Sequence, residues 1–80
     1  MKLNKAFAIR LSGILVERNI SKYKLEKDSG LTHSALRYIF NETNNDVKFS
    51  TIVKVCHALD MSLNEFFDNK IFDIKNLDFE

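Results

Sequence analysis

Apolar residues recur at intervals of three and four positions along most of the chain, which is the spacing of amphipathic helices. The first such segment covers residues 4–18, and we expect Asn4 to cap its start and Asn19 to end it. Gly13 marks either the close approach of another helix or simple tolerance of glycine at a cost of about 1 kcal/mol, and we favour tolerance. The inward positions of this helix are Phe7, Leu11, Ile14 and Leu15.

Two shorter helical patterns follow, over residues 22–29 and 33–40, with Gly30 between them. Ser21 can cap the first and Thr32 the second, because a hydroxyl oxygen at this position accepts a hydrogen bond from the first turn. Two short helices about a tight glycine turn form a helix-turn-helix, in which the second helix can lie in a DNA major groove. The expected core residues of this pair are Leu25, Leu36, Ile39 and Phe40.

The second half of the domain resumes the helical pattern after a polar loop over residues 41–48. A fourth helix is expected over residues 51–59, capped by Ser50. A fifth helix is expected to open with a capping box from Ser62 to Glu65. The inward residues of these two helices are Ile52, Val55, Cys56, Leu59, Phe66 and Phe67.

The tail, residues 68–80, partly alternates apolar and polar positions, which predicts an extended segment or an irregular path across the domain. Its apolar residues need burial, either in a dimer interface or against the first and fifth helices, and the sequence favours neither. These residues are Ile71, Phe72, Ile74, Leu77 and Phe79.

Eighty residues form one all-α unit, which we divide into a helix-turn-helix domain over residues 1–67 and the tail. The chain has no proline and only two glycines, which favours helices because strands and hairpins usually bring more turn residues. No apolar run approaches the roughly 18 residues of a membrane span, and the N-terminal residues resemble no signal peptide. The single cysteine, Cys56, fits a reducing compartment, so we expect a cytoplasmic protein.

The net charge of +1 conceals an uneven distribution. Residues 1–54 carry ten basic and five acidic side chains, whereas residues 55–80 carry two basic and six acidic ones. A basic front suits contact with a polyanion, although chance asymmetry in so short a chain explains the split equally well. Cys56 and His57 point about 100° apart on a helix and lack further ligands, so we expect no metal site. The sequence shows no catalytic set and no phosphate-binding glycine loop, which predicts a non-enzymatic protein without a cofactor or small-molecule ligand.

The outward face of the 33–40 helix carries the residues with the most binding chemistry. At about 100° per residue, the expected core residues leave the opposite face to side chains that form hydrogen bonds and include no acid. An arginine there can grip guanine O6 and N7, although any short amphipathic helix also turns polar residues outward. The candidate base-facing residues are His33, Ser34, Arg37 and Tyr38. The candidate phosphate contacts, each of which could equally be an ordinary solvated side chain, are Ser21, Lys22, Thr32, Asn41 and Lys48.

Residues 21–41 resemble the helix-turn-helix of the phage-repressor (Cro-like, XRE) family of bacterial transcription regulators, and residues 49–67 resemble its fourth and fifth helices. The resemblance covers roughly residues 5–67 and places Ser50 and Ser62 at the family's helix caps. It implies a compact five-helix, lambda-repressor-like domain whose members mostly bind operators as dimers. By position it matches Lys22 to a usual phosphate contact, and it matches the four base-facing candidates above to the family's base-contacting sites.

The sequence departs from the family pattern at the contacts between helices. Glu26 stands where the family usually has alanine packed under the recognition helix. Phe40 and Glu42 stand where many members have an acid and a glycine, and Leu15 replaces the arginine that pairs with that acid. An ion pair can be replaced by packed apolar residues without loss of stability, so the change at Leu15 and Phe40 is self-consistent.

The resemblance implies a small transcription regulator, with repression favoured, that binds double-stranded DNA as a homodimer. The alternative is a protein-interaction module or an antitoxin-like partner that uses the same fold with weak or no DNA binding. The modest net charge and Glu26 support this alternative.

Overall fold

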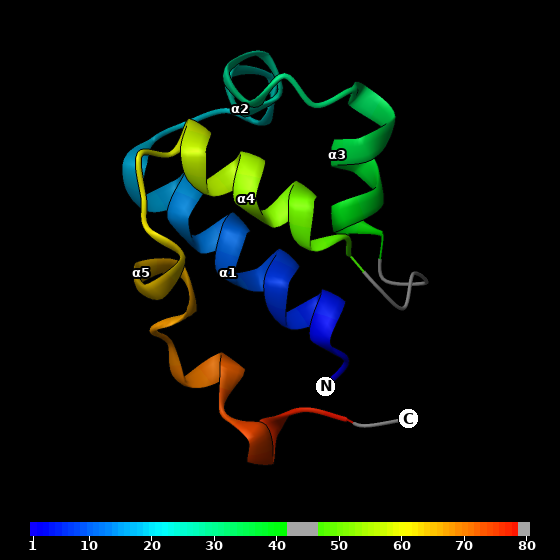
Figure 1. Cartoon of the computed structure of the whole chain (residues 1–80), viewed down its shortest axis with the longest axis vertical. Coiled ribbons are helices and arrows are strands. Elements are labelled where there is room, and N and C mark those ends of the chain that lie inside the picture. The colour runs from blue at the N-terminus through cyan, green and yellow to red at the C-terminus, as the bar shows by residue number, and fades with distance from the viewer. Residues whose placement is uncertain (42–46, 79–80) are drawn as a thin grey trace.

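The computed structural model describes residues 1–41 and 47–78, and this part of the chain forms five α-helices and no strand. The expected all-α architecture is confirmed, and Figure 1 shows α2 and α3 at one end of the molecule and the tail at the other. Helix α4 packs against α2 and α5, while α1 packs against α3. The helices are α1 (Leu3–Arg18), α2 (Lys22–Ser29), α3 (His33–Phe40), α4 (Phe49–Ala58) and α5 (Leu63–Phe67).

One hydrophobic core joins the five helices. Phe7 of α1 and Phe66 of α5 lie at its centre, with ring centroids 5.1 Å apart. Full burial of a side chain of this size stabilises the fold by about 1.5–3 kcal/mol. Every inward residue expected from the apolar spacing is buried except Phe40 and Phe67, which are half-buried and pack against the core. Sequence periodicity alone therefore identifies which face of each helix is inside.

Local hydrogen bonds explain why the helix-turn-helix begins and ends where the sequence indicates. The hydroxyl oxygens of Ser21, Thr32 and Ser62 each accept a hydrogen bond at 3.0 Å from the backbone N–H three residues later. Asn19 and Gly30 end α1 and α2 in the left-handed conformation, with φ values of 55° and 73°. The predicted bounds of α2 and α3 are confirmed. They could be predicted because these signals lie within one turn of each helix end.

Two predicted caps are wrong. Helix α1 begins at Leu3, and Asn4 lies inside its first turn with only 2% of its surface exposed. Asn4 shares the inward face with Phe7, so the helix runs through it instead of starting at it. Helix α4 begins at Phe49 because the Lys48 carbonyl already accepts hydrogen bonds from the first turn, which places the exposed Ser50 inside the helix.

Of the two paths predicted for the tail, the structure shows the irregular one across the domain and not the extended segment. The tail makes two single-turn 3-10 helices, η1 (Lys70–Phe72) and η2 (Ile74–Asn76), and η1 packs against α1. The Asn69 side chain caps η1 by accepting a hydrogen bond from a backbone N–H at 3.0 Å. Asparagine and aspartate bond readily to nearby backbone, so local turns win over a strand that has no partner.

The tail returns to the N-terminus of the chain, as Figure 1 shows. The Phe72 ring lies 6.0 Å from the Phe66 ring and 4.8 Å from the Phe67 ring. The Met1 ammonium group donates a hydrogen bond to the Asn76 carbonyl at 2.8 Å. Phe72 thus joins the core, whereas Ile74 remains 67% exposed and Phe79 lies outside the described residues. A domain boundary at residue 67 stays a prediction.

Candidate nucleic-acid interface

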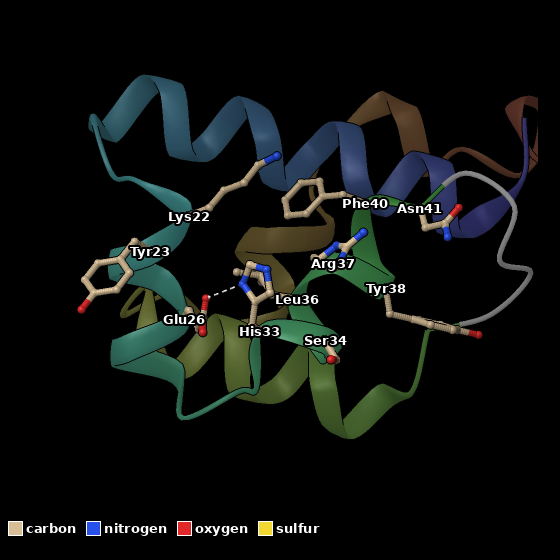
Figure 2. Close-up of a pocket in the computed structure, with 10 residues that line it drawn as sticks. All are labelled: Lys22, Tyr23, Glu26, His33, Ser34, Leu36, Arg37, Tyr38, Phe40 and Asn41. Atoms are coloured by element: carbon tan, nitrogen blue, oxygen red, sulfur yellow. Dashed lines mark hydrogen bonds and ion pairs between the residues drawn. The ribbon is translucent and has the colours of Figure 1, made fainter.

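An open groove between α2 and α3 brings together the four side chains expected to face bases (Figure 2). Leu36 and Ile39, with 3% and 1% of their surface exposed, hold the opposite side of α3 in the core. This packing fixes which side of α3 faces solvent. The groove is lined by Lys22, Tyr23, Glu26, His33, Ser34, Leu36, Arg37, Tyr38, Phe40 and Asn41.

The three arginines of the chain have different roles. Arg10 donates hydrogen bonds to the backbone carbonyls of Phe66 and Glu65 at 2.8 and 3.0 Å, and Arg18 donates one to the carbonyl of Leu59. Both therefore satisfy carbonyl groups at the ends of α4 and α5. Arg37 is exposed and makes no hydrogen bond or ion pair with another residue in the described part of the chain.

Because of this division of roles, fewer basic side chains of the front half are available to bind DNA than the charge count indicates. Two of the ten basic residues in the front half, Arg10 and Arg18, point at the acidic half and hold the fold together. Lys24 pairs with Asp28 one turn along α2, with 2.9 Å between nitrogen and oxygen. The basic groups that line the groove itself are Lys22 and Arg37.

Two of the expected phosphate contacts, Lys22 and Asn41, line the groove, and the other three lie elsewhere on the surface. Ser21 and Thr32 are exposed, and their hydroxyl oxygens are engaged as helix caps while their O–H groups can still donate. Asn41 is exposed at the end of α3 and lines the groove. Lys48 lies on the other side of α3, where it lines a second hollow together with Ser34 and Tyr38. Glu42 lies outside the described residues.

Comparison with known protein families identifies the domain. Residues 10–70 match the sequence model of the Cro/C1-type HTH DNA-binding domain. The chain belongs to this family. The match spans more than half of the chain and takes in the whole of α2 to α5. No curated protein and no solved structure gave a significant match.

The groove of this Cro/C1-type domain contains a contact that links its two signature helices. Glu26 Oε2 lies 3.2 Å from His33 Nδ1, and Figure 2 shows the two side chains pointing at each other. The Glu26 side chain is 27% exposed and lines the groove. The only sequence signal for the contact is an acid and a histidine on opposite sides of Gly30.

A second contact missed by the sequence analysis holds Lys22. Its ammonium nitrogen lies 4.1 Å from the centroid of the Phe40 ring, within the range of a cation–π interaction. Phe40 packs against the core cluster that contains Leu15, and the joint replacement of an ion pair at these two positions stays a prediction. The ring occupies the position at which the resemblance described above implies an acid in many members of the family.

The described residues form neither a metal-binding cluster nor a membrane-spanning helix. Cys56 is buried and His57 is exposed, as expected, and no group of three potential ligands that could hold a metal ion lies among the residues described. Within the same residues, no helix combines the length and apolar character needed to cross a membrane. DNA binding is the activity to which this Cro/C1-type domain and its groove both point.

Proposed function

We propose that this domain binds double-stranded DNA sequence-specifically by inserting α3 into the major groove, and that it acts as a transcription repressor. One observation carries the proposal: Arg37 stands on the outward face of α3, exposed and without a hydrogen bond or ion pair to any other described residue. An arginine in this position can donate two hydrogen bonds to guanine O6 and N7. Ser34 and Tyr38 flank it, and both can contact bases or phosphates.

The proposal divides the site residues by role. His33, Ser34, Arg37 and Tyr38 face the bases, because they share the groove side of α3. Phosphate contacts fix the register of the protein on the duplex and depend on salt. We assign them to Lys22 and Asn41 in the groove and to the exposed residues Ser21, Thr32 and Lys48.

Arg37→Ala tests the proposal directly. Loss of a bidentate contact to guanine costs about 1–3 kcal/mol, so affinity for a selected operator should fall by roughly 5- to 150-fold. Affinity for random duplex should fall far less. Fluorescence anisotropy with both duplexes measures the two losses. Lys54→Ala, an exposed cation on α4 that does not line the groove, is the matched control. Equal losses on both duplexes would show that Arg37 contacts only phosphate.

We also propose that the protein binds its operator as a homodimer. Two copies would place their α3 helices in successive major grooves, about 34 Å apart. Support comes from exposed apolar side chains that a second copy could cover, namely Leu3 and Phe49. Sedimentation velocity with and without operator should show a species of twice the chain mass. A monomer that protects a single half-site would contradict the dimer.

The alternative function is a protein-interaction or antitoxin-like module. The apolar hollow lined by Leu3, Phe49 and Phe72 suits a different protein partner as well as a second copy, because exposed apolar surface often marks a partner site. A gel shift on random duplex at low salt separates the two functions. Binding at micromolar protein supports the DNA-binding function, and its absence favours the interaction module.

A further inference from the structure

The contact between Glu26 and His33 constrains the chemistry of the imidazole. Glu26 Oε2 lies 3.2 Å from Nδ1, the ring nitrogen nearer the backbone. An ionised carboxylate can only accept hydrogen bonds, so Nδ1 must carry the hydrogen that joins the two groups. In a neutral imidazole one nitrogen donates and the other accepts. The second nitrogen, Nε2, is therefore a bare acceptor.

The bare Nε2 is the ring nitrogen left for an outside partner. The His33 side chain is 72% exposed and lines the groove at the N-terminal end of α3. The N-terminal residues of a recognition helix are those that usually contact base edges. In the major groove, only adenine N6 and cytosine N4 present hydrogen-bond donors, whereas guanine O6 and N7, thymine O4 and adenine N7 present acceptors. An acceptor at Nε2 can accept a hydrogen bond from adenine N6 or cytosine N4, and it is repelled by guanine and thymine, which present only acceptors.

We propose that Glu26 is a positioning residue that selects the tautomer of His33 and so sets its base preference to adenine or cytosine. This inference rests on the proposed placement of α3 in the major groove. Without the carboxylate, the imidazole can move its hydrogen to Nε2 and donate to guanine or thymine as well. The residue that departs from the family pattern thus becomes a specificity determinant, although it need not touch DNA.

Selection from a randomised duplex library tests the proposal at pH 8, above the pH of about 6.5 at which imidazoles ordinarily titrate. The wild type should select adenine or cytosine at one position, and His33→Ala should lose that preference and so locate the position. A single net hydrogen bond corresponds to a preference of roughly threefold to tenfold. Glu26→Ala should admit guanine or thymine there and reduce the preference to about twofold or less.

Two further variants make the comparison specific. Glu26→Gln keeps the shape of the side chain, but its amide can donate as well as accept, so it should relax the same position in part. Glu17→Gln removes one negative charge from an exposed position on α1 and should leave every position of the motif unchanged. An unchanged motif in Glu26→Ala overturns the proposal. A motif altered at every position also overturns it, because Glu26 would then act only by setting the angle between α2 and α3.

Long-range nitrogen–proton NMR correlations on His33 provide a readout that needs no DNA. In the free wild-type protein at pH 8, Nδ1 should be protonated and Nε2 bare. Glu26→Ala should shift the population toward the other tautomer. A wild-type spectrum with Nε2 protonated overturns the inference whatever the DNA result. A wild type that selects no motif overturns the proposed function instead, so the two failures are distinguishable.

Discussion

Lys22 has two expected roles, and a substitution can measure both. Its ammonium group lies 4.1 Å from the Phe40 ring centroid, and Lys22 also lines the groove as a proposed phosphate contact. A cation–π contact at an exposed site contributes about 0.5–1 kcal/mol. We expect Lys22→Met, which keeps most of the apolar stem, to lower the free energy of unfolding by that amount. For a domain of this size the loss corresponds to a melting temperature lower by about 2–8 °C.

A double-mutant cycle isolates the contact from the burial of the ring. Lys22→Met, Phe40→Leu and the double variant are compared by urea unfolding, and the coupling free energy should be about 0.5–1 kcal/mol. A coupling near zero would show that the ring contact contributes nothing to stability. DNA titrations over a salt series test the second role, because each lost phosphate contact lowers the salt slope by about 0.9 per bound copy. A slope unchanged in Lys22→Met would remove this residue from the interface.

Three further predictions concern stability and are checked by urea unfolding. Gly13→Ala should raise the free energy of unfolding by about 0.5–1 kcal/mol, because Gly13 lies inside α1 and an added Cβ meets no atom within 4 Å; a lower value would reveal a close approach there. Phe72→Ala should cost about 2 kcal/mol, less than the 3–5 kcal/mol of a fully buried phenylalanine, while Ile74→Ser should change stability by less than about 0.5 kcal/mol. Equal losses in the two variants would contradict the different burial of these side chains. Burial raises the pKa of the Cys56 thiol. The buried neutral thiol therefore stabilises the fold fully below the unfolded pKa of about 8.5, and this stabilisation is lost as the pH rises from there through the higher pKa of the folded state. Cys56→Val should flatten the decline in stability above pH 8.5, and an identical decline in both proteins would refute this assignment.

The helix-turn-helix could be predicted from sequence because its determinants are local. Ser21, Thr32 and Gly30 act within one turn of the helix ends they define, so their effects do not depend on the rest of the fold. The caps assigned to Asn4 and Ser50 were wrong. Each helix starts one or two residues earlier because the carbonyls of Lys2 and Lys48 already accept backbone hydrogen bonds from the first turn, which capping propensity alone does not reveal.

The contacts that join distant segments could not be predicted from residue spacing. Arg10 bonds to the carbonyl of Phe66, 56 positions away, and its place on α1 gives no indication of that partner. The charge count of the front half therefore overstated the basic surface available to DNA. The outward-facing residues of α3 could be predicted, because helical periodicity fixes which side chains share a face once the core side of the helix is known.

Two of the departures from the family pattern, Glu26 and Phe40, act on the same groove and together leave it with a net positive charge. Among the lining residues, Lys22 and Arg37 are positive and Glu26 is negative, which leaves the groove with a net charge of +1 when His33 is neutral. An acid at position 40 would cancel that charge and could hold Lys22 in an ion pair. The Phe40 ring instead holds the ammonium group without neutralising it, so the full charge remains able to attract phosphate. Phe40 thereby offsets the acid that Glu26 introduces, and Glu26 can orient His33 without making the groove electrostatically neutral.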